Sequence, residues 1–71
     1  MSVEIVSPMP GTIIEVLVKT GDKVNADDEL IILESMKMEN PICASLDGTV
    51  TEVKVEEQDK VQVNQVLAII D

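Results

Sequence analysis

Apolar residues occur along the chain in short runs rich in Val and Ile, and no window keeps a helical period. The turn signals "PMPG" (8–11) and "LDG" (46–48) each lead into such a run, and "TGD" (20–22) and "EQD" (57–59) are expected to be turns. Short β-branched runs bounded by turn residues are typical of strands. The pattern therefore predicts an all-β chain.

The pattern also repeats after 37 positions. The segment "GTIIEVLVKTGDKVNADDELIILE" (11–34) aligns with "GTVTEVKVEEQDKVQVNQVLAIID" (48–71), and ten of the 24 aligned pairs are identical. A repeat this short cannot bury an apolar face alone, so the two copies must pack together. We therefore predict two similar halves, 1–34 and 38–71, related by a pseudo-twofold axis.

Within each copy, the spacing of apolar residues predicts a β-bulge. Val50, Val53 and Val55 are apolar, whereas Thr51 and Glu52 are polar, and strict alternation would not give this spacing. One extra residue near 51–52 would put all three valines on one face of the strand. By repeat symmetry a second bulge is expected near 14–15, which would align Ile13, Val16 and Val18.

The remaining apolar positions predict two further strands in each half. A short strand is expected to hold Val24 in the first half or Val61 in the second. Alternation in the last strand of each half predicts an inward face made of Leu30 and Ile32, with Leu67 and Ile69 as their mates. We therefore expect about eight short strands in two facing sheets, forming a flattened sandwich or barrel as one domain over residues 1–71.

The junction of the two halves is expected to be a hairpin. The strand that ends at Glu34 should pair with the strand that begins at Glu39, with Ser35–Met38 as the tip. The tip lacks the Asn-Gly or Asp-Gly pair that favours tight hairpins, so this prediction rests on the symmetry of the repeat. Asn40-Pro41 fits only an edge strand or an irregular end, because Pro cannot donate to a ladder.

Composition limits both the core and the partners. The 71 residues include no Phe, Tyr or Trp, so the core must be aliphatic. The net charge of −9 argues against nucleic acid and against anionic membranes, and no apolar run approaches a membrane span. Cys43 is the single cysteine, which suits a reducing compartment, and a lone Cys is usually a small packing residue. We expect a cytosolic protein.

An independent catalytic or metal site is not expected. The chain has no His to activate a nucleophile and no CxxC pair to bind zinc. "ADDE" (26–29) lacks the ligand spacing and glycine of a calcium loop, so a solvated turn is expected there. Glu34 and Glu39 could do acid–base chemistry in principle, but a small closed sandwich offers no deep pocket to desolvate them.

Lys37 is the remaining candidate for chemistry. It lies between Met36 and Met38 at the junction of the two copies, where an exposed amine could be presented to another enzyme. The alternative is that Lys37 is ordinary and both methionines cover the end of the core, because Met is a common gap filler. Two methionines that bracket a lysine between the repeats favour covalent modification of Lys37.

The motif "ESMKMEN" (34–40) resembles the attachment motif of biotinyl domains, and "SPMPGTIIEVLVKTGDKV" and "ASLDGTVTEVKVEEQDKV" resemble the two halves of such domains. The resemblance implies a biotin carboxyl carrier with two four-stranded antiparallel sheets. It also implies that a biotin protein ligase attaches biotin to Lys37 through biotinyl-adenylate, with Met36 and Met38 as flanking residues. Glu34, Ser35 and Glu39 complete the motif. A biotin carboxylase would then load CO2 onto biotin, and a carboxyltransferase or decarboxylase would remove it.

This sequence departs from the biotinyl pattern at Ser35, where the family commonly has Ala, and it has no "thumb" insertion in its first half. A lipoyl domain of the same fold is an alternative, but its lysine usually follows an Asp, whereas Met36 precedes Lys37 here. A structural domain without a prosthetic group, as in membrane-fusion adaptor proteins, is a second alternative. Such domains lack the Met-Lys-Met frame. The chain is expected to be either a free-standing carrier or an excised domain.

Overall fold

The computed structural model describes residues 2–71, which form eight strands. The strands are β1 (Val3–Val6), β2 (Gly11–Val16), β3 (Lys23–Val24), β4 (Glu29–Ser35), β5 (Met38–Cys43), β6 (Gly48–Val53), β7 (Lys60–Val61) and β8 (Val66–Ile70). The described residues contain no helix. The prediction of an all-β chain with about eight short strands is confirmed.

The strands form two antiparallel sheets that are related by the repeat. One sheet has the order β1-β8-β6-β3 and the other has the order β5-β4-β2-β7. A shift of 37 residues converts each strand of one sheet into the strand at the same place in the other. The short strands β3 and β7 each pair with a strand of the opposite half, so neither half forms its sheet alone. The predicted pseudo-twofold arrangement is therefore confirmed.

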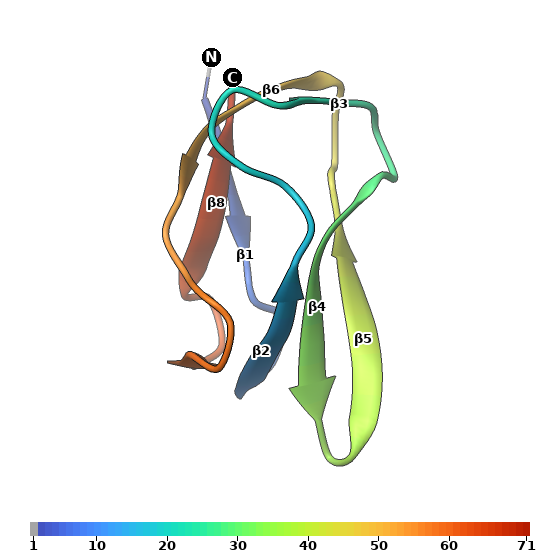
Figure 1. Cartoon of the computed structure of the whole chain (residues 1–71), viewed down its shortest axis with the longest axis vertical. Helices are drawn as coiled ribbons and strands as arrows, with labels where there is room; N and C mark the ends of the chain where they lie inside the picture. Colours follow the sequence, from blue (N-terminus) through green and yellow to red (C-terminus); the bar gives the residue numbers. More distant parts are fainter. Residues whose placement is uncertain (1) are drawn as a thin grey trace.

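The molecule is elongated, with extents of 32 × 17 × 17 Å. Figure 1 shows that the β4–β5 turn lies at one end of the long axis, whereas the start of β1 and the C-terminus lie at the other end. Both long strands of the hairpin run along this axis. The fold thus separates the turn from the start of β1 and from the C-terminus by the length of the domain.

Both predicted bulges are present. The register of β2 against β4 shifts between Ile13 and Glu15, and the register of β6 against β8 shifts between Val50 and Glu52. Ile13 and Val50 are fully buried, and the later valines of each strand pack on the core. The extra residue in each strand therefore keeps the apolar positions on one face, as the spacing predicted.

The predicted inward face of β4 and β8 is partly wrong. Leu30 and Leu67 are fully buried, but Ile32 and Ile69 are only half-buried. The ladder partners skip Leu30 between β4 and β5, so the alternation changes phase there. The mate Leu67 is skipped in the same way between β1 and β8. The fully buried residues after each irregularity are Ile31 and Leu33 in β4, and Ala68 and Ile70 in β8.

The core is aliphatic, as the composition required. Its buried residues are Ile5, Ile13, Val24, Leu30, Ile31, Leu33, Ile42, Ala44, Val50, Val55, Val61, Leu67, Ala68 and Ile70. Both sheets contribute to this single cluster, which also buries the short strands through Val24 and Val61. The core thus depends on both copies of the repeat.

Two predictions about β5 have opposite outcomes. β5 is an edge strand, so Pro41 lies in a place where its missing N–H is tolerated, as predicted. Cys43, however, is exposed, and the prediction that it is a packing residue is wrong. Its neighbour Ile42 is buried, and the alternation of a strand turns the next side chain outward.

Candidate functional site

The β4–β5 hairpin ends in a two-residue turn made of Met36 and Lys37. Glu34 pairs with Glu39 and Ser35 pairs with Met38, so the strands continue to the last possible residue on each side. The predicted hairpin with its tip at Ser35–Met38 is confirmed. The structure narrows the unpaired part of that tip to the two central residues.

The turn has an unusual backbone for its sequence. Met36 has φ 54° and Lys37 has φ 65°, and a two-residue type I′ hairpin turn requires positive φ at both positions. Asn-Gly and Asp-Gly usually supply this conformation, and neither pair occurs here. For an ordinary L-residue the left-handed region costs about 1–2 kcal/mol. The hairpin therefore holds strain at Lys37 and at the residue before it.

The side chains of the tip point into solvent. Met36 is 92% exposed and Met38 is 65% exposed, and Lys37 is also exposed. Within residues 2–71, the Lys37 ammonium makes no hydrogen bond or ion pair. Both methionines are too exposed to cover the end of the core, so the gap-filler interpretation is wrong. The tip instead presents an amine between two apolar, flexible side chains.

The two glutamates of the motif lie directly opposite each other below the tip. Glu34 and Glu39 are a cross-strand pair, both are exposed, and the described residues give neither carboxylate a hydrogen-bond or ion-pair partner. Like charges that face each other across a ladder destabilise a hairpin. Glu34 and Glu39 therefore give the stem a negative charge that does not support the fold.

Asn40 makes a contact beside the turn that the sequence analysis did not predict. Its side-chain Nδ2 donates a hydrogen bond to the carbonyl oxygen of Met38 at 3.2 Å. This bond restrains Met38, the first residue of β5, which directly follows Lys37. The only signal in the sequence is that Asn40 ends the motif "MKMEN", and that position alone does not reveal the contact.

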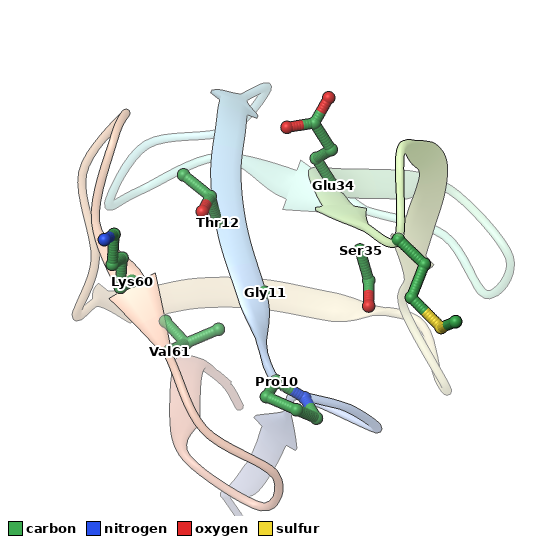
Figure 2. Close-up of a pocket in the computed structure, with 8 residues that line it drawn as sticks. Pro10, Gly11, Thr12, Glu34, Ser35, Lys60 and Val61 are labelled. Carbon is green, nitrogen blue, oxygen red and sulfur yellow. The ribbon is translucent and has the colours of Figure 1, made fainter.

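An open hollow of about 440 Å³ lies beside the turn. Its lining comes from the start of β2, the end of β4 with the turn, and β7, and consists of Pro10, Gly11, Thr12, Glu34, Ser35, Met36, Lys60 and Val61. Figure 2 shows Gly11 between Ser35 on one side and the β7 residues on the other. The strands approach closely at Gly11, where an added Cβ would collide with the backbone oxygen of Glu34. This hollow was not predicted.

The other acidic segment is a turn. Asp28 accepts a hydrogen bond from the backbone N–H of Asn25 at 2.8 Å, and Asp27 takes positive φ. The prediction of a solvated turn at 26–29 is confirmed. Among the described residues, no group of three or more His, Cys, Asp or Glu side chains is placed to hold a metal ion. Within the same range, no helix is long and apolar enough to cross a membrane.

Comparison with known proteins assigns this arrangement to a family. The family described as "Biotin-requiring enzyme" matches residues 3–70. The chain is 61% identical over 41 residues to the gamma subunit of glutaconyl-CoA decarboxylase from Acidaminococcus fermentans, a match that covers 58% of this chain and 28% of the relative. It is 58% identical over 40 residues to the biotin carboxyl carrier protein of Streptococcus mutans, covering 56% of this chain and 31% of that protein.

The fold also matches a solved structure over its whole length. The crystal structure of the Kluyveromyces lactis urea carboxylase contains a region that superposes with a TM-score of 0.94 at 28% identity. That match covers 100% of this chain and 6% of the urea carboxylase chain. The chain therefore spans less than a third of the two curated relatives and a small part of the large enzyme.

Proposed function

The chain belongs to the family of biotin-requiring enzymes, and we propose that it is a biotin carboxyl carrier whose Lys37 holds biotin in amide linkage. The observation that carries this proposal is the position of Lys37. It is exposed in a two-residue turn at the end of the molecule, and its ammonium has no partner among the described residues. The surface that other enzymes would recognise is formed by the neighbouring residues of the motif, namely Glu34, Ser35, Met36, Met38 and Glu39.

Attachment requires that Lys37 react without unfolding of the domain. A biotin protein ligase supplies the biotin carboxyl group in activated form, the Nζ of deprotonated Lys37 attacks its carbonyl carbon, and a C–N bond replaces the bond to the leaving group. Nζ loses a proton in the same exchange and becomes a neutral amide. Because Lys37 contacts no other described residue through its amine, this change of charge disturbs no ion pair of the fold.

Bound biotin would supply a ring nitrogen that holds CO2 as a carboxyl group. The chain's own contribution is presentation of that group. The turn lies at the far end of a domain 32 Å long, away from the C-terminus, so the tip can enter an active site while the rest of the chain stays outside (Figure 1). The paired strands β4 and β5 hold the turn that carries Lys37 at this end of the domain.

The partners in this proposal are a biotin carboxylase that loads CO2 and a carboxyltransferase or decarboxylase subunit that removes it. The relatives named as a decarboxylase subunit and a carrier protein support partners of this kind. A net charge of −9 would steer the domain towards basic surfaces on those partners. The exposed methionines would provide adaptable apolar contact at the tip itself.

We further propose that the chain catalyses no reaction itself and works in the cytosol. The sequence contains no His, and the motif glutamates lie on an exposed stem. Cys43 is a free, exposed thiol, which suits a reducing compartment. Biotin-dependent chemistry would therefore belong to the partner subunits, with this chain as the moving carrier.

Intact mass of the protein isolated from its native host tests the proposal. We expect the mass of the chain plus one biotin in amide linkage, with peptide mapping that locates the group on Lys37. A mass increase that corresponds to lipoate would replace the proposed function by a lipoyl carrier. An unmodified chain in cells that contain biotinylated proteins would contradict a carrier function of either kind.

A further inference from the structure

One ladder row of the β5-β4-β2-β7 sheet lies on its outer face. Ile32 pairs with Pro41 of β5 on one side and with Glu15 of β2 on the other, and these three strands lie side by side in Figure 1. The neighbours of Ile32 along β4, Ile31 and Leu33, are fully buried, whereas Ile32 is only half-buried. Alternation therefore turns Ile32 outward, and the residues directly opposite share its side of the sheet.

Two further apolar residues of the same chain segment extend this row. Ile14 is the extra residue of the β2 bulge, so it also opposes Ile32, and it is half-buried. Val16 packs on the core, so alternation turns the next residue, Leu17, outward. The backbone N–H of Leu17 still donates to a carbonyl oxygen of β4 at 2.8 Å, and its side chain is 43% exposed. These residues form an apolar face, which consists of Ile14, Leu17, Ile32 and Pro41.

The other sheet has no such face, although the repeat provides a mate for each residue. Three of the four residues have a polar mate, and the mates are, in the same order, Thr51, Lys54, Ile69 and Glu4. The reverse exchange occurs at Val6, which is 37% exposed and whose mate is Cys43. Both sheets cover the same core from equivalent positions, so the fold itself does not require apolar residues on the outside of only one of them.

Carboxylates without partners border the apolar face. On the other sheet, Glu52 forms an ion pair with Lys54 at 3.3 Å. Glu15 is the mate of Glu52, but Leu17 stands in place of the lysine, and the Glu15 carboxylate makes no ion pair within residues 2–71. The facing glutamates of the hairpin stem lie two ladder positions closer to the turn. An apolar centre with unpaired acids at its border is complementary to a protein surface that has basic residues around an apolar centre.

The apolar face is continuous with the hairpin that presents Lys37. The pair Ile32–Pro41 lies three ladder positions from the last pair before the turn, which is about 10 Å at the usual rise of a strand. A ligase must bring its active site to the lysine amine itself, which has a stem of only four carbons, so the ligase surface must approach the strands beside the turn. An enzyme that acts on bound biotin reaches a group at the end of a longer arm. The place of the face therefore favours the ligase as its partner.

We propose that the apolar face docks the biotin protein ligase that modifies Lys37, an inference that rests on the proposed function. The exposed members, Leu17 and Pro41, pack against an apolar centre on the ligase, and Glu15 lies beside basic residues around that centre. None of these side chains touches the reacting amine, so they bind the ground state and the transition state equally. Their loss therefore raises KM and leaves kcat unchanged.

Initial rates of biotinylation by the ligase of the native host, with biotin and ATP, test the docking face. Leu17→Gln with Pro41→Gln removes the exposed apolar side chains, and Lys54→Gln with Glu4→Gln places the same residues at the mates. Both double variants keep the net charge of −9, because the first exchanges neutral residues and the second loses one Lys and one Glu. We expect the KM for the protein to rise by about tenfold in the first variant at unchanged kcat, and both constants to stay at the wild-type values in the second.

A second matched pair tests the basic character of the ligase surface. Glu15→Gln removes the unpaired carboxylate beside the apolar face, whereas Glu52→Gln makes the same change of charge on the other sheet. At low salt, kcat/KM should fall by about two- to threefold for Glu15→Gln and by less for Glu52→Gln. The difference should disappear at high salt, because salt screens exposed charges. Equal effects at low salt would overturn the proposed contact between Glu15 and basic residues of the ligase.

The outcomes separate the docking face from the carrier function. Wild-type protein that takes up no biotin by intact mass would overturn both. Normal biotinylation of the wild type, with an unchanged KM for Leu17→Gln with Pro41→Gln, would overturn the docking face alone. A wild-type dimer in sedimentation equilibrium that this double variant abolishes would assign the face to a second copy of the chain and contradict ligase docking. Urea denaturation checks the folding of each variant, and Leu17→Gln alone decides the matter where the double variant does not fold.

Discussion

The turn at Met36–Lys37 is built differently from the four turns that the two halves share. The shared turns span residues 19–22, 25–28, 56–59 and 62–65. In each turn the backbone N–H of the last residue donates a hydrogen bond to the carbonyl oxygen of the first. A side-chain oxygen of the last residue also accepts a hydrogen bond from the backbone N–H of the first. Each contains one residue at positive φ, namely Gly21, Asp27, Gln58 and Asn64. Three of these four are Gly, Asp or Asn, the residue types that tolerate this conformation best.

The hairpin turn lacks the residue types and the side-chain acceptor that support the shared turns. Met36 and Lys37 are both at positive φ, neither is Gly, Asn or Asp, and the described residues provide no side-chain oxygen that accepts from either N–H. Glu34 and Glu39 add like-charge repulsion immediately below. The shared turns therefore contain residues suited to the fold, whereas the residues of the hairpin tip are suited to presentation of an amine.

The largest expected effect on stability comes from a substitution in the core, next to the hairpin tip. Leu33→Ala, at a fully buried position three residues before the turn, should lower the free energy of unfolding by about 2–5 kcal/mol. The free energy of unfolding of the whole domain is only about 4–10 kcal/mol, so the variant will be close to unfolding. Met36→Ala is the control and should change stability by under about 0.5 kcal/mol. Equal losses in urea denaturation would contradict the division between core and tip.

Replacement of the turn by a favourable pair should stabilise the protein and abolish its function. Met36→Asn with Lys37→Gly supplies the Asn-Gly pair that a type I′ turn prefers, so the free energy of unfolding should rise by roughly 1–3 kcal/mol. The variant has no amine at position 37 and should accept no biotin. Thermal unfolding and intact mass measure both effects. A turn that gains no stability would show that the backbone at Met36 and Lys37 is not strained.

Removal of a side-chain acceptor should weaken a shared turn without an effect on the site. Asp59 accepts from the N–H of Glu56 at 2.8 Å, and its mate Asp22 accepts from the N–H of Lys19 at 2.9 Å. Asp59→Ala and Asp22→Ala should each lower stability by about 0.5–1.5 kcal/mol. Both variants should be biotinylated at the wild-type rate. A slower rate for either would show that the shared turns also serve the tip.

The smallest expected effect on stability is at the methionines. Met36→Leu with Met38→Leu nearly conserves volume at exposed positions, so stability should change by under about 0.5 kcal/mol. We nevertheless expect the ligase or the carboxylase to recognise the methionine thioethers. Biotinylation or carboxylation of the double variant should therefore be slower than that of the wild type. Rates equal to the wild type, together with a clear loss of stability, would show that the methionines serve the fold.

Much of the fold was predictable because the repeat supplies each observation twice. The bulge near 51–52 follows from Val50, Val53 and Val55, and symmetry extends it to 14–15. The phase of β4 was not predictable, because an apolar run from Leu30 to Leu33 gives alternation nothing polar to follow. Cys43 was mistaken for a packing residue since composition alone does not say which side of an edge strand a residue occupies.

The candidate site also has a part that the sequence predicted and a part that it did not. Lys37 and its neighbours are contiguous, so their position at the junction of the repeats predicted the tip. The backbone at Met36 and Lys37 was not predictable, because neither residue type favours positive φ. The hollow brings together residues from β2, β4 and β7 and depends on the close approach at Gly11, which no local pattern records.

Biotinylation of Lys37→Arg in vitro tests the central claim most directly. Unmodified wild type, Lys37→Arg and the control variants Lys23→Arg and Lys60→Arg are incubated with biotin, ATP and a biotin protein ligase, and intact mass is followed with peptide mapping. The account predicts one biotin on the wild type and on both controls, each gaining one unit of negative charge relative to its unmodified form, and none on Lys37→Arg. Biotin on folded Lys37→Arg, or its loss from a folded control, would contradict the assignment of Lys37 as the single attachment site.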